Sequence, residues 1–139
     1  MLYRIQQDPE GNVLAATYPR DVDTFNTVWA RVIADPAAVQ RAILVGDTVV
    51  GSIGLHKQDG RDAVGFWIDR ACWGKGIAGR ALGLLLKEVS IRPLLARAAR
   101  DNAASIRVLE RNGFRVSGYE FVEGTERFRA GERVMMVLE

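Results

Sequence analysis

The stretch Trp73-Gly74-Lys75-Gly76-Ile77-Ala78-Gly79-Arg80 lies between a predicted strand and a predicted helix, and it decides the fold. Its glycines let the backbone turn its N–H groups inward, because no Cβ atom stands in the way. The first four N–H groups of the following helix have no partner within the helix, and the helix dipole favours an anion there. The segment therefore predicts a pyrophosphate cradle, although glycines alone would also serve a tight turn from strand to helix.

The same glycines, Gly74, Gly76 and Gly79, also match the pattern G-x-G-x-x-G of dinucleotide-binding folds. Asp101 stands about where the ribose-binding acid of such a fold would be. Three observations count against this interpretation. Five residues, 69–73, separate the predicted strand from the first glycine, and the preceding strands form a hairpin meander. Only 60 residues follow Gly79, which is too few for the remaining βαβ units.

The hydrophobic pattern on either side predicts the order of the elements. Strands are expected at Leu2–Gln6, Val13–Thr17, Arg41–Val45, Thr48–Leu55, Ala63–Ile68, Leu94–Ala99, from Phe114, and at Arg133–Leu138. Helices are expected from Asp23 until Pro36 ends the pattern, at Ile77–Val89 and at Asn102–Asn112, with Gly113 as the left-handed residue after the last one. Turns are expected at residues 9–12, at Gly46-Asp47 and at Asp59-Gly60. This order predicts an α+β fold, a three-layer α/β/α arrangement with a mixed sheet.

A second group of residues follows the predicted strand Leu94–Ala99. Asn102, Ser105 and Leu109 are spaced i, i+3, i+7, so they share one helix face near its start. Taken alone, Asn102 also suits the N-cap of that helix, and Ser105 suits a neutral surface position.

Together the two segments resemble the GNAT superfamily of acyl-CoA N-acyltransferases, most closely the branch of the ribosomal-protein N-terminal acetyltransferases. The resemblance rests on Val64-Gly65-Phe66-Trp67-Ile68-Asp69, on residues 73–78, and on Asn102-x-x-Ser105-Ile106 through Gly113-Phe114. It covers about residues 40–118 and implies a mostly antiparallel sheet that splays at the cofactor site. Trp73 stands where the family motif usually has Arg or Gln.

The resemblance implies that acetyl-CoA is the donor and that a primary amine attacks its thioester directly. A backbone N–H near Phe66–Ile68 would stabilise the oxyanion, in the gap where that strand parts from Leu94–Ala99. Asn102 would hydrogen-bond the pantetheine arm. The expected cofactor-binding residues are Phe66, Trp67, Ile68, Trp73, Gly74, Lys75, Gly76, Ile77, Ala78, Gly79, Arg80, Asn102 and Ser105. No metal is expected.

The acid–base residues depart from those of many relatives. Leu109 stands where many have a tyrosine acid, and Ala63 where many have a glutamate base. Ser105 is the expected replacement for the acid, as the hydrogen-bond donor to the departing thiolate. The base is left open among His56, Asp62, Glu120, Tyr119 and water. Because two of the usual groups are missing, a non-catalytic acyl-CoA-binding module of the same fold remains the alternative.

Length and composition bound the remaining expectations. The 139 residues are 48% apolar and suit one domain, residues 1–139. The single cysteine, Cys72, excludes an internal disulfide and any metal site built from cysteines, which favours the cytoplasm. No signal peptide or membrane segment is expected.

The charge is unevenly divided along the chain. The net charge is +2, with the excess of Lys and Arg after residue 70. That excess suits a small phosphate-bearing ligand better than nucleic acid, and an ordinary solvated surface is the simplest alternative. The acceptor is expected to be an amine of unknown identity, and the protein a monomer or a homodimer.

Overall fold

The computed structural model describes residues 1–139 and contains a single six-stranded sheet. The strands are β1 (Gln40–Val45), β2 (Thr48–Gln58), β3 (Arg61–Ile68), β4 (Leu94–Ala99), β5 (Arg115–Val122) and β6 (Gly131–Leu138). Their order in the sheet is β1-β2-β3-β4-β6-β5, and every neighbouring pair is antiparallel except β3 with β4. The helices are α1 (Leu2–Ile5), α2 (Pro9–Leu14), α3 (Val22–Ala34), η1 (Arg70–Cys72), α4 (Ile77–Glu88) and α5 (Ala103–Arg111).

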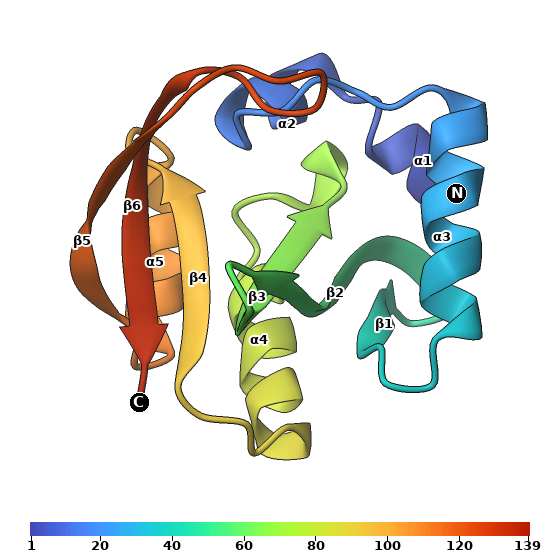
Figure 1. Ribbon diagram of the computed structural model, residues 1–139. Helices are drawn as coiled ribbons and strands as arrows, with labels where there is room; N and C mark the ends of the chain where they lie inside the picture. Colours follow the sequence, from blue (N-terminus) through green and yellow to red (C-terminus); the bar gives the residue numbers. More distant parts are fainter.

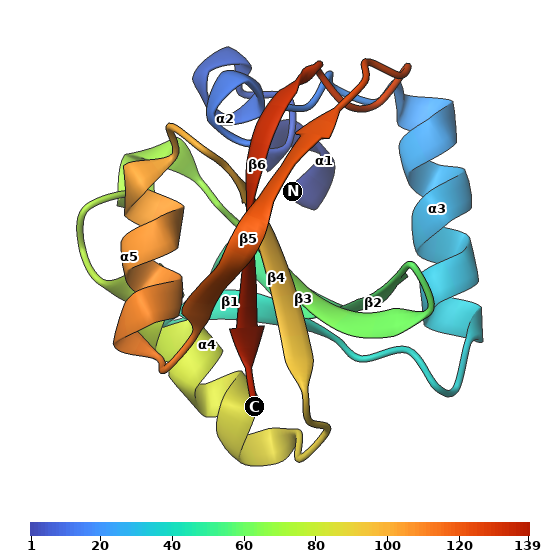
Figure 2. The ribbon, with the colours of Figure 1, turned by 60° about the vertical axis from the view of Figure 1, so that its left-hand side comes forward.

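Helices cover both faces of this sheet, as Figures 1 and 2 show. The helices α4 and α5 lie on one face, where α4 packs against β2 and β3, and α5 packs against β4. The helix α1 contacts β2, and α3 lies on the side of the sheet away from α4 and α5. The predicted α+β class, with a mixed and mostly antiparallel sheet, is confirmed.

The main core lies between the sheet and the α4–α5 layer. Its fully buried side chains include Leu82 of α4, Leu94 of β4, Leu109 of α5 and Met136 of β6. Successive side chains of a strand point to opposite faces. In β4, Leu94 and Ala96 therefore join this core, and Arg97 points to the opposite face of the sheet.

The predicted strands at Leu2–Gln6 and Val13–Thr17 are wrong, because both segments belong to short helical turns or loops. Asp8 caps α2 by accepting a hydrogen bond from the Gly11 N–H at 3.0 Å, and Pro9 occupies its first position. That pair is a helix-start signal that also suits a turn, which explains the error. In the second segment only Thr17 makes a strand-like contact, an isolated bridge to Phe128.

From residue 21 onward the predicted elements are confirmed within a few residues. Leu94–Ala99 is a strand with the predicted bounds, and Gly113 has the predicted left-handed backbone, with φ 93°. The main difference is β2, which continues three residues beyond Leu55. No helix in the structure is long and apolar enough to cross a membrane.

Candidate functional site

The two parallel strands in the centre of the sheet separate soon after they meet. The strands β3 and β4 pair only at Ala63 and Leu95, and each continues for several residues beyond that point. Alternate backbone N–H and C=O groups of Phe66–Ile68 therefore face the gap without a partner strand on that side. The predicted splay of the sheet is thus present, next to the residues expected to supply an oxyanion donor.

The glycine loop after β3 has a run of free backbone donors. Gly74 and Gly76 have positive φ angles of 76° and 74°, which only glycine adopts without strain. None of the six backbone N–H groups from Gly74 to Gly79 donates a hydrogen bond within the protein. The first donor of the helix ladder is Arg80 N–H, which binds the Gly76 carbonyl at 3.1 Å. The loop therefore offers consecutive amides, at the positive end of a twelve-residue helix, to an anion.

Two side chains hold this loop in place. Trp73 Nε1–H donates to the Ile68 carbonyl at 3.0 Å, which ties the loop to the end of β3. Asn112 Nδ2 donates to the carbonyls of Gly79 and Val108, at 3.3 and 2.9 Å, and so joins the first turn of α4 to the end of α5. At the position where the family motif has Arg or Gln, Trp73 thus acts as a tether.

The N-terminus of α5 forms the opposite wall. Asn102 Oδ1 accepts a hydrogen bond from Ser105 N–H at 3.3 Å, so the N-cap alternative considered for Asn102 is present. Its Nδ2 donates to the Leu14 carbonyl of α2 at 3.1 Å. The half-buried Ser105 hydroxyl makes no hydrogen bond within the protein, whereas Leu109 is buried in the core. Ser105 is therefore available to donate to a ligand, and Leu109 is not.

These parts enclose a cleft of about 330 Å³ between β3, the glycine loop, α5 and α2. Eleven of the thirteen predicted cofactor-binding residues line it, and the exceptions are Lys75 and Arg80. It is also lined by residues that were not predicted, namely Gly11, Leu14, Ala15, Cys72, Ala104, Arg107, Val108 and Arg111. The spacing of residues 104, 107, 108 and 111 along one helix face could have indicated four of these. Nothing in the sequence indicated that α2 closes the cleft.

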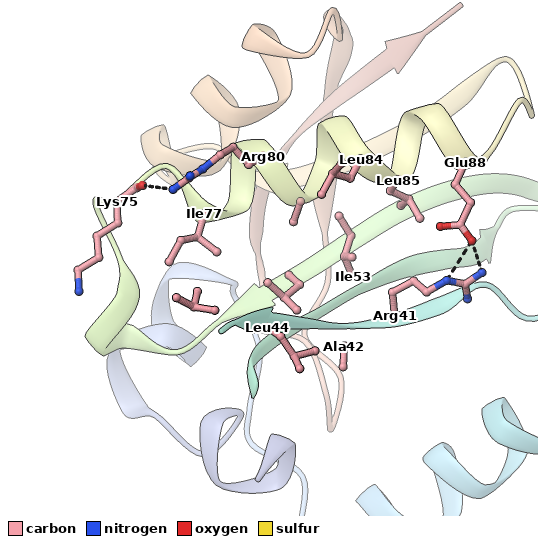
Figure 3. Close-up of a pocket in the computed structure, with 13 residues that line it drawn as sticks. Arg41, Ala42, Leu44, Ile53, Lys75, Ile77, Arg80, Leu84, Leu85 and Glu88 are labelled. Carbon is pink, nitrogen blue, oxygen red and sulfur yellow. Dashed lines mark hydrogen bonds and ion pairs between the residues drawn. The ribbon is translucent and has the colours of Figure 1, made fainter. Parts of the chain in front are cut away.

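Lys75 and Arg80 line a second groove, between β1 and α4 (Figure 3). Arg80 Nη2 donates to the Lys75 carbonyl at 3.2 Å, and an Arg41–Glu88 ion pair closes the far end. This groove is larger, about 570 Å³, and mostly apolar. It lies away from the gap between β3 and β4, so its size does not make it the site of the chemistry. A phosphate contact by Lys75 or Arg80 stays a prediction.

Of the four side chains considered as a base, His56 has the most suitable surroundings. It pairs with Ala63 across β2 and β3, and its ring lies 3.6 Å from the point where a Cβ of Gly65 would be. Partial desolvation, together with the charge of Arg97, lowers the pKa of His56. The imidazole is therefore neutral at pH 7, in the form that accepts a proton.

The other three candidates are already engaged. Asp62 forms an ion pair with Lys57 at 3.0 Å, and Glu120 lies 3.8 Å from Arg97. The Arg100 guanidinium lies over the ring of Tyr119, with its Cζ atom 4.9 Å from the centroid of that ring. No group of three His, Cys, Asp or Glu side chains is placed to hold a metal ion.

Comparisons with known proteins agree with this arrangement. Residues 1–115 match the family model described as acetyltransferase (GNAT) domain. No curated protein sequence matches the chain significantly.

Several solved structures share the fold. A ribosomal-protein-alanine N-acetyltransferase from Brucella melitensis is 21% identical, with a TM-score of 0.81 over 99% of this chain and 91% of that one. A spermidine N-acetyltransferase from Vibrio cholerae, solved with CoA and spermine, is 15% identical, with a TM-score of 0.81 over 98% and 86%. A probable acetyltransferase is 26% identical, with a TM-score of 0.73 over 95% and 81%.

Proposed function

The chain belongs to the GNAT acetyltransferase family, and we propose that it acetylates a primary amine by direct attack of that amine on acetyl-CoA. The observation that carries this proposal is the run of six unpaired N–H groups from Gly74 to Gly79 at the start of α4. Gly74, Lys75 and Gly76 are exposed and residues 77–79 are half-buried, so these donors are open to a ligand. Consecutive free N–H groups at the positive end of a helix suit a ligand with several acceptor oxygens. A pyrophosphate has that chemistry.

The residues of the cleft fit the rest of the cosubstrate. Asn102 already uses one Nδ2 proton and one Oδ1 lone pair within the protein, which leaves one of each for the amide groups of a pantetheine arm. Arg107 and Arg111 lie one turn apart on α5 and have no carboxylate partner within 4.0 Å. They are suited to the phosphate groups, where Arg commonly binds.

Acetyl-CoA supplies the activated acetyl group, and the chain supplies three functions around it. His56 accepts the proton that the ammonium must lose, directly or through water, before nitrogen can attack. A backbone N–H of Phe66–Ile68 donates to the carbonyl oxygen as the bond from nitrogen to carbon forms. The bond from carbon to sulfur then breaks, and the Ser105 hydroxyl donates a hydrogen bond to the departing thiolate. Water carries to that sulfur the second proton, which the nitrogen loses as the amide forms, since a hydroxyl is itself a weak acid.

The test is a reaction of the purified protein with acetyl-CoA and a panel of primary amines. We expect CoA release that depends on the amine, with an equal amount of acetylated amine in the mass spectrum. Binding of acetyl-CoA is measured in parallel by calorimetry.

The alternative, a non-catalytic acyl-CoA-binding module, is supported by the residues at the two usual acid–base positions. Leu109 and Ala63 are both buried and carry no titratable group. Acetyl-CoA binding without acetylation of any amine in the panel would favour this alternative over catalysis.

A further inference from the structure

The five partly or fully buried basic side chains of this protein lie together, away from the cleft described above. Of the 19 Lys and Arg residues, 14 are exposed. The other five, which we call the arginine cluster, are Arg20, Arg97, Arg127, Arg129 and Arg133. They come from the α2–α3 connection, β4, the β5–β6 connection and β6. Burial of a charge is costly without a partner, so this grouping needs an explanation.

Contacts between neighbours make the arginine cluster continuous. Arg133 Nη2 donates to the Arg129 carbonyl at 2.5 Å, and the Arg129 guanidinium lies 4.4 Å from the centroid of the Tyr18 ring. Arg127 Nη1 donates to the Tyr18 carbonyl at 2.7 Å. Arg20 follows Tyr18 by two residues, and Figure 1 shows the β5–β6 connection reaching across to α2.

Four members of the arginine cluster have no carboxylate within 4.0 Å. Only Arg97 approaches one, Glu120 at 3.8 Å. Asp21, Glu123 and Glu126 are near in sequence but form no ion pair, and Asp101 influences Arg133 only from a longer distance. Arg20 makes no side-chain hydrogen bond at all, although its guanidinium is half-buried. Burial and the charge of Arg20 lower the pKa of Arg127 to about 10.

Tethering explains only part of this arrangement. Arg127 and Arg129 each donate one side-chain hydrogen bond to a backbone carbonyl, and these two bonds hold the β5–β6 connection against residues 17 and 18. Each guanidinium has five N–H donors, so most donors of the arginine cluster remain free. A free carboxylate or phosphate would satisfy them and remove the mutual repulsion of the charges.

One end of the arginine cluster lies on β4, one of the two strands that border the gap where the reaction is proposed to occur. Arg97 and Arg133 lie on the face opposite α4 and α5, since Arg133 pairs with Ala99 and Arg97 shares its face with Ala99. Arg97 also influences the pKa of His56, the proposed base. The cleft for the cosubstrate opens beside α5 and the glycine loop, so the amine has the opposite face, with His56 and the arginine cluster, from which to approach.

We propose that the arginine cluster binds an anionic group of the acceptor, so that the substrate is an amine that also carries a carboxylate or a phosphate. This inference rests on the proposed acetyl transfer and specifies its substrate class. A polyamine would bring a second positive charge against these arginines. The same charges disfavour the ammonium form of a bound amine, which assists its deprotonation at a site without a carboxylate base.

The test compares amines of similar length and basicity that differ in charge. The probes are 5-aminopentanoate, pentylamine and 1,5-diaminopentane, and a phosphate arm compares O-phosphoethanolamine with ethanolamine. We expect kcat/KM for 5-aminopentanoate or O-phosphoethanolamine to exceed that of its neutral analogue by about 10-fold or more, with the diamine poorest. The arm with the larger ratio identifies the anion. A diamine acetylated as well as 5-aminopentanoate overturns the inference.

Variants connect the preference to these residues. Arg20→Gln breaks no hydrogen bond, and Arg127→Gln removes the charge next to Arg20. Each variant should lower the ratio of kcat/KM for the anionic amine to kcat/KM for the neutral amine by about 10-fold. Arg127→Lys, which keeps the charge, should retain most of the ratio. Arg61→Gln, at the exposed start of β3, is the matched control and should leave the ratio unchanged. Lower melting temperatures with unchanged ratios would reduce the arginine cluster to a tether and overturn the inference.

A binding measurement separates this inference from the proposed function. Calorimetry with 5-aminopentanoate and 1,5-diaminopentane is carried out on protein saturated with CoA, where no reaction occurs. Tighter binding of 5-aminopentanoate, lost in Arg20→Gln, supports the anion site even if no amine is acetylated. Equal binding of both amines overturns it, whatever the activity.

Discussion

The glycine loop and the arginine cluster both suit anions, but they are built in different ways. The loop uses backbone N–H groups from one short stretch, residues 74–79, at the start of α4. The arginine cluster uses long side chains from four separate parts of the chain, between Arg20 and Arg133. A site built from backbone groups is disrupted when a substitution adds a Cβ atom or a charge at one of its glycines. It tolerates exchange of the side chains at its other positions. A side-chain site can change its specificity by one substitution, which suits an acceptor site better than a site for a common cosubstrate.

The largest effect is expected from a charge placed in the backbone site. In Gly76→Asp, a carboxylate would stand against the pyrophosphate, and two unit charges about 4 Å apart repel by about 4 kcal/mol near a protein surface. Affinity for acetyl-CoA should therefore fall by about a thousandfold in calorimetry.

The fold should survive this change. A Cβ at Gly76 meets no atom within 4 Å, so only the strain of a φ of 74° is added. Gly60 has a φ of 78° in the β2–β3 turn and equally open surroundings, so Gly60→Asp is the matched control for strain and charge. Equal affinities of the two variants would contradict a cradle at Gly74–Gly79.

The next largest effect concerns His56, on the acceptor face. His56→Gln should lower kcat/KM by about 100-fold, the lower range of general-base catalysis. The lowered pKa of His56 gives the sign of the pH dependence. As the pH falls through that value, the imidazole gains a proton and loses its function as a base.

The pH profile distinguishes His56 from the protonation of the amine itself. The slope of log kcat/KM against pH should steepen from about one to about two below the pKa of His56, and remain about one in His56→Gln. A profile that is the same in both proteins would assign the proton to water.

In the cleft, Ser105→Ala tests a single hydrogen bond to the thiolate. Such a bond to a charged group contributes roughly 1.5–3 kcal/mol, so kcat should fall by about 10- to 150-fold while KM for acetyl-CoA changes less. Ser105→Cys, with a weaker donor, should lie between. If Ser105→Ala retains its kcat within about twofold, with chemistry rate-limiting, Ser105 has no role in thiolate departure.

The smallest effect is expected at the exposed end of the cleft, where Arg107 and Arg111 lie. Dephospho-CoA, which lacks the 3′-phosphate, should bind several-fold more weakly than CoA and with a shallower dependence on salt, because exposed charges are strongly screened. Arg107→Gln should reduce the difference between the two ligands. Equal binding of CoA and dephospho-CoA at every ionic strength would assign these charges to an ordinary surface.

The same contrast between local and distant construction explains what the sequence could predict. The glycine loop, the helix start at Asn102 and the strand Leu94–Ala99 depend on neighbouring residues, and each was predicted within a residue or two. The placement of eleven predicted residues around one cleft follows from that local order.

Contacts between residues far apart in the sequence could not be predicted, because no local pattern specifies them. The four-residue helix α1 is held by packing, with Ile5 buried and Tyr3 edge-on to Phe25 at 5.3 Å, and its own pattern also suits a strand. The arginine cluster requires the register of β4 with β6 and the bridge between Thr17 and Phe128. No local pattern in the sequence brings Arg20 to Arg127.

The central claim, that the free amides of residues 74–79 hold the phosphates of the cosubstrate, can be observed directly. Amide hydrogen exchange of the full chain, resolved by NMR with and without saturating CoA, reports on each of these N–H groups. We predict that the amides from Gly74 to Gly79 exchange at least about ten times more slowly with CoA bound, while those of the β2–β3 turn at Asp59-Gly60 are unchanged. CoA binding that leaves the exchange of Gly74–Gly79 unaltered would contradict the account.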